Sequence, residues 1–345
     1  NEKNRDNDKE KERKSVVNPV GRAGGVYIPP FKLAQMRKEE EGKNDPNSKE
    51  MQRMTWEALR KSINGLINTV NVGNIRRIVP ELFEENLHRG RGVLCRSIMK
   101  AQLASPGFTH IYASLIALIN TKLPEIGELL LKRVVFSFRR AYKRNDKSVA
   151  VALAKFIAHL VNQQIAHEIL ALEMLEVLLG EPTDDSVEIS VNFVKEVGQI
   201  LQELCPTGFR AIFDRFLGIL QSGDVDKRAQ YTIENLFAIR KSGFADFPST
   251  TKELDLVEES DKITHEISLE DKIDKQEMLD VFRVDPEYEE NEKLWKTMKA
   301  EFLGESDSSD DESGSEGDDE SSSDDDDDDD DDDDNGDNNQ NMQGQ

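Results

Sequence analysis

The chain has 345 residues with 69 acidic and 45 basic side chains, which gives a formal net charge of −24. Residues 305–345 hold 21 of the acidic side chains and no basic one, so residues 1–304 are close to neutral, with 48 acidic and 45 basic side chains. Because the acidity belongs to one tail, the composition excludes a strongly basic nucleic-acid binder and equally a chain that repels nucleic acids along its whole length.

The cysteines and the apolar runs of the sequence exclude two further classes of protein. Cys95 and Cys205 form no CxxC pair, which argues against a disulfide scaffold and a cysteine-based zinc site. Lys155 and His159 interrupt the apolar stretch at 149–161, and no run reaches the roughly 18 apolar residues that a membrane helix needs. We therefore expect no membrane association.

Residues 1–54 are charged and poor in apolar side chains, so we expect a mobile N-terminal arm that buries too little surface to fold. The segment 24–33 differs from the rest of the arm. Pro29 and Pro30 favour an extended backbone, and Tyr27, Ile28 and Phe31 flank them. We interpret this segment as a docking peptide, with a passive linker as the alternative.

Apolar residues recur at three- and four-residue steps from residue 55 to residue 243, and Gly, Pro, Asn and Asp clusters interrupt them. The pattern predicts ten helices at 55–70, 74–88, 91–104, 108–122, 124–143, 147–162, 165–179, 185–204, 207–221 and 225–242. Short connections make neighbouring helices antiparallel. We expect an all-α solenoid of about five antiparallel helix pairs, whose loops line the edges where a partner binds.

The helical pattern weakens after this domain, in residues 244–304. Acidic residues there alternate with spaced apolar anchors such as Leu254 and Ile267, which is typical of an extended strap over the helices. A final helix is predicted from Pro286 to Leu303, with Asp285 as its N-cap. Residues 305–345 include eleven consecutive aspartates, and we expect a disordered acidic linker.

Motifs for catalysis, metals and cofactors are missing from the sequence. There is no GxxxxGK[ST] loop, and His167 and Glu168 start an HExxH-like string whose fifth residue is Ala171 instead of a second histidine. We find no nucleophile and base at a characteristic spacing. The sequence therefore predicts no catalytic residue, no metal site and no cofactor.

The end of the first predicted helix has an unusual composition. Gly65 costs about 1 kcal/mol relative to Ala in a helix interior, and Asn64, Asn68 and Asn71 favour turns. A glycine lets a second surface approach closely, and asparagine amides both donate and accept hydrogen bonds. We interpret these four residues as candidate partner contacts, with fraying of the helix before a turn as the alternative.

Two later turns combine charged and amide side chains in the same way. Their candidate contact residues are Arg144, Asn145, Asp146 and Lys147 in the first turn and Thr183, Asp184 and Asp185 in the second. In the second turn, Asp184 or Asp185 is expected to cap the next helix, which is a structural role that competes with partner binding.

Basic residues also cluster along the chain. The candidates for an RNA or phosphate contact are Arg89, Arg91, Lys132, Arg133, Arg139, Arg140 and Lys143. Aromatic residues that would stack on bases do not alternate with them, so a solvated helix face is the favoured interpretation.

Several short sequence segments together resemble those of one known protein family. They are residues 55–59, the asparagine-rich segment, and residues 89–92, 142–147, 182–188 and 226–228, with 24–33 and 254–259 outside the ten helices. With them the sequence resembles the spliceosomal Cwc scaffold family, in its twenty-second member, over about residues 20–304. The resemblance implies a HEAT-type domain like the middle domain of translation initiation factor 4G.

The resemblance also implies a partner and a mechanism. The partner is the DEAD-box ATPase initiation factor 4A, isoform three, which the scaffold delivers to the spliceosome for exon-junction-complex assembly. The scaffold holds the two RecA-like lobes of the ATPase apart, through a first-helix contact that maps onto Gly65, Asn68 and Thr69. Thr69 departs from the family, where Lys is frequent, so one charged contact is weakened or replaced. The resemblance also adds three residues to the candidate partner contacts: Asp226, Lys227 and Arg228.

The resemblance also implies where the protein is located and with what it assembles. We expect a nuclear protein of the spliceosome and of nuclear speckles, associated there with spliceosomal proteins, snRNA and pre-mRNA, and a monomer outside that assembly. Two alternatives stay open. One is a splicing component that binds RNA directly through the basic cluster, and the other is a translation-initiation scaffold.

Overall fold

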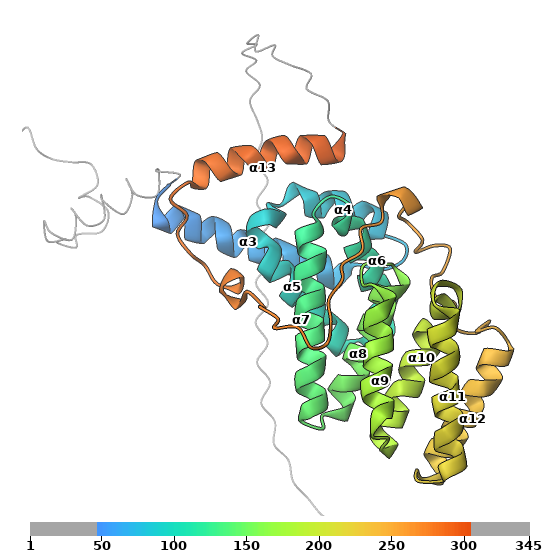
Figure 1. Ribbon diagram of the computed structural model, residues 1–345. Coiled ribbons are helices and arrows are strands. Elements are labelled where there is room, and N and C mark those ends of the chain that lie inside the picture. Colours follow the sequence, from blue (N-terminus) through green and yellow to red (C-terminus); the bar gives the residue numbers. More distant parts are fainter. Residues whose placement is uncertain (1–46, 305–345) are drawn as a thin grey trace, which may run out of the picture. The chain divides into compact units, whose positions relative to one another are not determined.

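A computed structural model describes residues 47–304 of the chain, and within this range it has eleven α-helices and no strand (Figure 1). Ten of the helices follow one another: α3 (Lys49–Thr69), α4 (Ile75–Glu84), α5 (Leu87–Ala104), α6 (Thr109–Asn120), α7 (Pro124–Lys143), α8 (Lys147–Asn162), α9 (Glu168–Gly180), α10 (Asp184–Leu204), α11 (Pro206–Ser222) and α12 (Lys227–Lys241). The predicted docking peptide at 24–33 and the predicted acidic linker lie outside the described residues.

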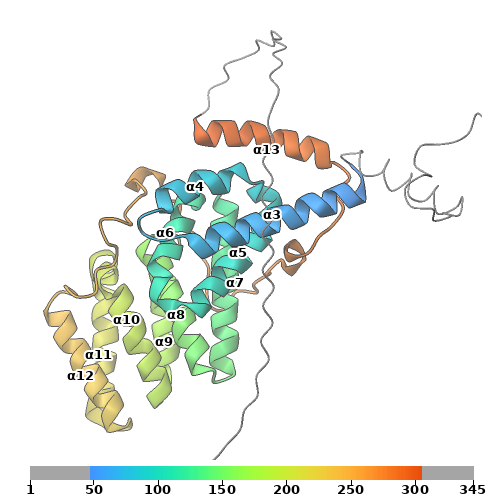
Figure 2. The ribbon, with the colours of Figure 1, turned by 180° about the vertical axis from the view of Figure 1, so that it is seen from behind.

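The ten helices form two layers. Helices α4, α6, α8, α10 and α12 contact one another in turn and make one layer, while α3, α5 and α7, and likewise α9 and α11, contact one another in the other layer (Figures 1 and 2). Each odd-numbered helix also contacts the helix that follows it. The predicted all-α, HEAT-like stack of five helix pairs is therefore confirmed.

Helix α7 shows why these sequences form a stack. Leu130, Val134 and Phe138 recur at four-residue steps and are buried, whereas Arg139 and Arg140 are exposed on the other side. Burying a large aliphatic or aromatic side chain contributes about 1.5–3 kcal/mol. A helix with such a face gains its stability from the neighbours that cover the face, which explains why the pairs stack.

The first helix begins earlier than predicted, at Lys49 instead of residue 55. Ser48 is the N-cap, and its hydroxyl accepts a hydrogen bond from the Met51 backbone N–H at 3.2 Å. The charged residues of this first part hid the helix, because only Gln52 is buried before Trp56. Residues 49–54 are thus part of the fold and not of the N-terminal arm.

The predicted break at Gly90 and Gly92 is wrong, because both glycines lie inside α5. The break comes earlier, at Glu85 and Asn86, and Asn86 caps α5 by accepting from the Arg89 backbone N–H at 2.9 Å. Both glycines serve packing. A Cβ on Gly90 would lie 2.7 Å from Ile63 Cδ1, and one on Gly92 would lie 2.4 Å from the Leu279 carbonyl oxygen.

Residues 244–287, here called the strap, run over the helices without forming a long helix of their own (Figure 1). The strap begins with Phe244, which is fully buried against Gly198 and has a left-handed backbone with φ of +58°. Farther along, its backbone carbonyls accept hydrogen bonds from the stack. Ser114 Oγ donates to Leu254 at 2.6 Å, and Asn120 Nδ2 donates to Ile263 at 2.7 Å.

The last helix is α13 (Tyr288–Leu303), which packs against α4 (Figure 2). It begins two residues after Pro286, so Asp285 is not the N-cap as predicted. The Asp285 backbone instead exchanges two hydrogen bonds with Gln52 of α3, at 2.8 and 2.9 Å. Trp295 of α13 is buried and anchors the helix.

No helix in the described range is long and apolar enough to cross a membrane.

Candidate partner-binding surfaces

Helix α3 carries a bare face near its C-terminal end. Gly65, Asn68 and Thr69 follow the three- and four-residue spacing that places residues on one side of a helix, and all three are exposed. On the opposite side, Ile63 and Ile67 are almost completely buried. A Cβ built on Gly65 would meet nothing within 4 Å. We call Gly65, Asn68 and Thr69 the α3 face.

The asparagines of this segment have different roles. Asn71 Oδ1 accepts from the backbone N–H groups of Gly73 at 2.9 Å and Asn74 at 3.1 Å and so builds the turn into α4. Asn64 Oδ1 accepts from Ser97 Oγ of α5. The side chain of Asn68 has no hydrogen-bond partner among the described residues, which leaves it available to a partner. Asn64 and Asn71 are therefore structural residues in this fold.

The turn between α7 and α8 is built by Asn145 and Asp146. Asn145 adopts a left-handed backbone with φ of +54°, a conformation that asparagine tolerates better than most residues. Asp146 is the N-cap of α8, where its carboxylate accepts from the Val149 backbone N–H at 3.3 Å. This turn presents Arg144 and Lys147 to the solvent side of the stack.

The turn between α9 and α10 is capped by Thr183, so the prediction of Asp184 or Asp185 as the cap is wrong. Thr183 Oγ1 accepts from the Ser186 backbone N–H at 3.1 Å, and Ser186 Oγ accepts from the Thr183 backbone N–H at 2.9 Å. This reciprocal pair completes a capping box in which serine takes the place usual for glutamate. The carboxylates of Asp184 and Asp185 are thereby free to reach other turns.

Those carboxylates link three successive turns. Lys147 Nζ lies 2.7 Å from Asp185 Oδ1 and 2.9 Å from Glu188 Oε2, and the Arg228 guanidinium lies 3.6 Å from the same Glu188 carboxylate. The hydrogen bonds to Asp185 and Glu188 raise the pKa of Lys147 above its usual value. Glu188 ends the segment 182–188 but was not among the candidate contacts, although its position three residues after Asp185 places both carboxylates on one face of α10.

A backbone contact completes this set of linked turns. The Asp226 N–H donates to Asp184 Oδ1 at 2.8 Å, while the Asp226 carboxylate accepts from the Ala229 N–H at 2.6 Å as the N-cap of α12. Lys227, the first residue of α12, is exposed. The turns after α7, α9 and α11 thus form one edge of the stack, at the bottom of Figure 1. We call this edge the linked turns.

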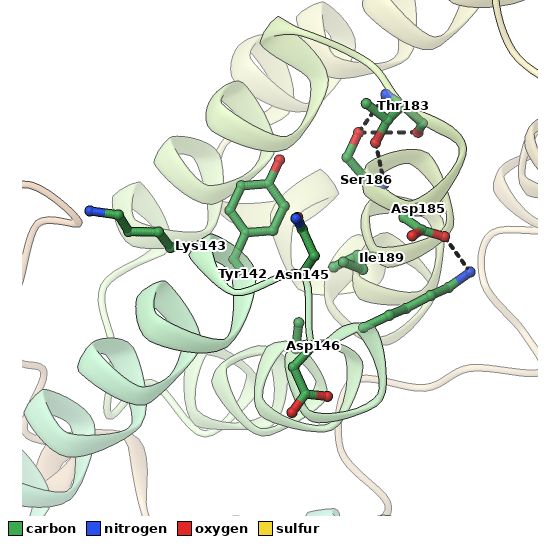
Figure 3. A pocket seen from close by; sticks show the side chains of 10 residues that line it. Tyr142, Lys143, Asn145, Asp146, Thr183, Asp185, Ser186 and Ile189 are labelled. Carbon is green, nitrogen blue, oxygen red and sulfur yellow. Dashed lines mark hydrogen bonds and ion pairs between the residues drawn. The ribbon is translucent and has the colours of Figure 1, made fainter.

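A pocket of about 490 Å³ lies between the first two of these turns (Figure 3). Tyr142 and Asn145 line one side, and Thr183, Asp185 and Ile189 line the other. The Lys143 side chain points away from the others in this view. The structure does not bring the linked turns and the α3 face together, because the turn after α3 lies away from this edge in Figures 1 and 2.

Two of the predicted phosphate-binding residues are occupied inside the fold. Arg89 donates to the Gln52 carbonyl at 2.7 Å and stacks on the Tyr288 ring at 4.8 Å, which holds α13 against α3. Arg133 is 5% exposed and lies 2.8 Å from the Asp280 carboxylate of the strap. Neither guanidinium is available to an external phosphate.

Other members of the basic cluster are more exposed. Lys132 pairs with Glu128 at 2.6 Å, Arg139 donates to the Asp271 carbonyl at 2.8 Å, and Arg91 donates to the His88 carbonyl at 2.6 Å. The remaining cations of the cluster, Arg140 and Lys143, are exposed and form no ion pair with a described residue. The predicted basic strip is therefore not a continuous surface of free charges.

No group of three or more His, Cys, Asp or Glu side chains in residues 47–304 is arranged to hold a metal ion. His167 instead serves as the N-cap of α9, where its Nδ1 accepts from the Ile169 backbone N–H at 3.3 Å. The geometry thus describes a helical-repeat protein whose polar residues cap its helices, link its turns and hold the strap in place.

Comparison with known proteins identifies the family of this helical-repeat protein. The MIF4G domain model matches residues 60–243, which is more than half of the chain. The chain therefore belongs to the MIF4G domain family.

Relatives share most of the sequence. The chain is 58% identical to the pre-mRNA-splicing factor cwc22 of Aspergillus fumigatus over 82% of its length, and 53% identical to the pre-mRNA-splicing factor CWC22 homolog of Danio rerio over 87%. The homolog from Homo sapiens is 52% identical over 86%. These matches confirm the resemblance to the spliceosomal Cwc family. The chain spans about a third of the length of these relatives, with 32%, 30% and 33% covered.

Proposed function

We propose that this chain is a non-enzymatic scaffold of pre-mRNA splicing that works in the nucleus, in the spliceosome and in nuclear speckles. Its membership in the MIF4G domain family and its similarity to pre-mRNA-splicing factors over more than 80% of its length support this role. The partner that we propose is the DEAD-box ATPase initiation factor 4A, isoform three. The scaffold would deliver this ATPase to the spliceosome for exon-junction-complex assembly.

The observation that carries the proposal is the α3 face. Gly65 has open space where a side chain would be, and Asn68 keeps its amide unpaired among the described residues. A glycine beside a free amide allows a second backbone to come close and to exchange hydrogen bonds with the helix. Thr69 donates to the Leu66 carbonyl at 3.0 Å, so it adds no charge to the contact.

The proposed mechanism depends on the stiffness of the helical stack. Successive helix pairs share one core from Trp56 to Leu236, so the stack resists bending, whereas the two lobes of a DEAD-box ATPase are flexibly joined. A stiff surface that binds the open arrangement of the lobes better than the closed one shifts the equilibrium toward the open one. The shift equals the difference between the two binding free energies, and it keeps the ATPase inactive.

Substitution of Gly65 by Tyr tests the contact. A Cβ at this exposed position would meet no other part of the fold within 4 Å, but the tyrosine ring would prevent a close approach, and we expect ATPase affinity to fall at least about 100-fold. Gly218→Tyr is the matched control, since Gly218 also lies exposed inside a helix with open space around it. Surface plasmon resonance with purified ATPase measures both variants. Equal affinity of the two variants would refute the α3 face as the contact.

An activity measurement tests the mechanism separately. We expect an excess of the chain to suppress RNA-stimulated ATP hydrolysis by the ATPase, and Gly65→Tyr to remove this suppression. Stimulation of hydrolysis would contradict the open-lobe mechanism and favour a scaffold of the translation-initiation type.

A further inference from the structure

A second surface carries cationic side chains that form no ion pair with a described residue. Two adjoining pockets of about 630 and 670 Å³ lie between α3, α5, α7 and the strap, and Arg96, Lys100 and Asp280 line both of them. We call these two pockets the α5 groove. Gly65, Asn68 and Thr69 do not line it, although Lys61 of the groove lies one turn before Gly65 on α3.

Positive charge is in excess in the α5 groove. All three of its carboxylates are already paired: Glu57 with Arg60 at 2.6 Å, Asp280 with Arg133 at 2.8 Å, and Glu277 with Lys275. Four further cations line the groove and form no ion pair with a described residue: Lys61, Arg96, Lys100 and Arg140.

Helix α5 itself bears part of this unbalanced charge. Arg96 and Lys100 are exposed and stand four residues apart, so they lie on the same helix face and repel each other. Neither side chain forms an ion pair with a described residue. An anionic ligand in the groove would remove the repulsion.

The wall of the groove already holds an acidic segment of the chain. The short helix η4 (Glu277–Asp280) of the strap lies on α5, where the Leu279 backbone rests on Gly92, and its Asp280 carboxylate binds Arg133 of α7. This segment has an acidic residue at each end, Glu277 and Asp280, and the apolar Met278 and Leu279 between them. The surface formed by α5 and α7 is therefore suited to a peptide with carboxylates and aliphatic residues.

The remaining lining of the groove favours a peptide over RNA. Leu103 and Val281 are 38% and 53% exposed at its rim and offer aliphatic contacts. Its aromatic side chain, Phe136, has the Lys275 ammonium 4.3 Å from the ring centroid, so that ring face is covered. Stacking of bases on open aromatic faces is what holds single-stranded RNA in most sequence-tolerant grooves.

We propose that the α5 groove binds an extended acidic segment of a partner protein. Its carboxylates contact Lys61, Arg96, Lys100 and Arg140, and an aliphatic side chain packs against Leu103 and Val281. Charge-assisted contacts of this kind set the orientation and the rate of association.

The test uses the full chain and a fluorescein-labelled twelve-residue peptide of repeating Asp-Glu-Leu, with fluorescence anisotropy at low salt. We expect Arg96→Glu with Lys100→Glu to weaken binding about tenfold or more, because two attractions become repulsions. Arg53→Glu with Arg210→Glu is the matched control. Arg53 and Arg210 are exposed, lie outside the groove and change the net charge equally, so affinity should change less than about twofold.

Further arms separate the proposal from its alternatives. Leu103→Asp should also weaken binding, and a peptide of repeating Asn-Gln-Leu should not bind. Circular dichroism verifies that each variant is folded. Equal binding by the two double variants would overturn the proposal. So would groove-dependent binding of a twelve-nucleotide oligouridine by a chain that ignores the peptide.

Discussion

Arg133 and the α3 face use polar groups in opposite ways. Arg133 is buried and places its guanidinium on the Asp280 carboxylate and on the carbonyls of Gly92, Lys275 and Gln276, at 2.8 to 3.0 Å. On the α3 face, by contrast, the Asn68 amide has no partner among the described residues and Gly65 has no side chain.

This contrast distinguishes polar groups that stabilise the fold from polar groups that the fold does not need. A buried charge that loses its partners is costly, so such a residue must be retained for stability. An exposed amide without a partner in the fold is hydrated by water and contributes little to stability, so it can be replaced at little cost to the fold. The same contrast explains why Arg133 and Arg89 are poor candidates for phosphate binding although both are basic.

Replacing Arg133 should give the largest effect on stability. Arg133→Ala removes a buried guanidinium and leaves the partly buried Asp280 carboxylate without its cation, and we expect the free energy of unfolding to fall by about 3 kcal/mol. Urea unfolding followed by circular dichroism measures the change. Arg139→Ala is the control, because Arg139 is exposed and makes one hydrogen bond to the strap, and it should cost about 1 kcal/mol or less. Similar losses for the two variants would break the comparison.

Glu196 provides a pH-dependent test of the same idea. It lies 2.8 Å from Lys155 Nζ and 3.2 Å from His159 Nε2. Burial by itself would raise the pKa of Glu196, but the contacts with His159 and Lys155 outweigh it and lower the pKa from 4.5 to about 2. The stabilisation is therefore present above about pH 4.5 and is lost as the pH falls toward 2.

Replacement of Glu196 by Gln should remove this pH dependence. We expect Glu196→Gln to lower the free energy of unfolding by about 2 kcal/mol at pH 7 and to have almost no effect at pH 2. Urea unfolding at a series of pH values measures the difference between the two chains. Glu203→Gln, at an exposed position, should follow the unchanged chain throughout. A difference that persisted at pH 2 would show that charge is not the cause.

Two asparagines three residues apart give the smallest and sharpest contrast. Asn71→Ala removes the acceptor for two backbone N–H groups, so it should cost about 1 kcal/mol of unfolding free energy. Asn68→Ala should change stability by less than about 0.5 kcal/mol, yet it should weaken ATPase binding. Urea unfolding and surface plasmon resonance on both variants test this prediction. A stability loss at Asn68 would mean that its amide has a partner inside the fold.

The sequence predicted the helices well where periodic apolar residues face a core, as in α7 and α8. It failed where tertiary contacts decide the local structure. Gly90 and Gly92 normally indicate a break, but here they let Ile63 and the Leu279 backbone approach α5. The charged start of α3 was hidden because its contacts come from Asp285, more than 200 residues away.

The candidate sites were predictable only in part. Composition alone drew attention to Gly65 and Asn68, since glycine and asparagine are costly inside a helix. The role of Arg133 could not be predicted, because two of its partners are backbone carbonyls on the strap. Arg96 and Lys100 escaped notice because their significance depends on Asp280 and Glu57 being paired elsewhere, which only the three-dimensional arrangement reveals.

The pair of hydrogen bonds between Gln52 and Asp285 has a consequence for biosynthesis. The two residues are 233 positions apart, and a ribosome that adds about 5–20 residues per second needs on the order of tens of seconds to make the chain between them. Helix α3 must wait that long for its last neighbour while later helix pairs assemble behind it. The pace of translation, and not diffusion, therefore sets the earliest moment at which the nascent domain closes.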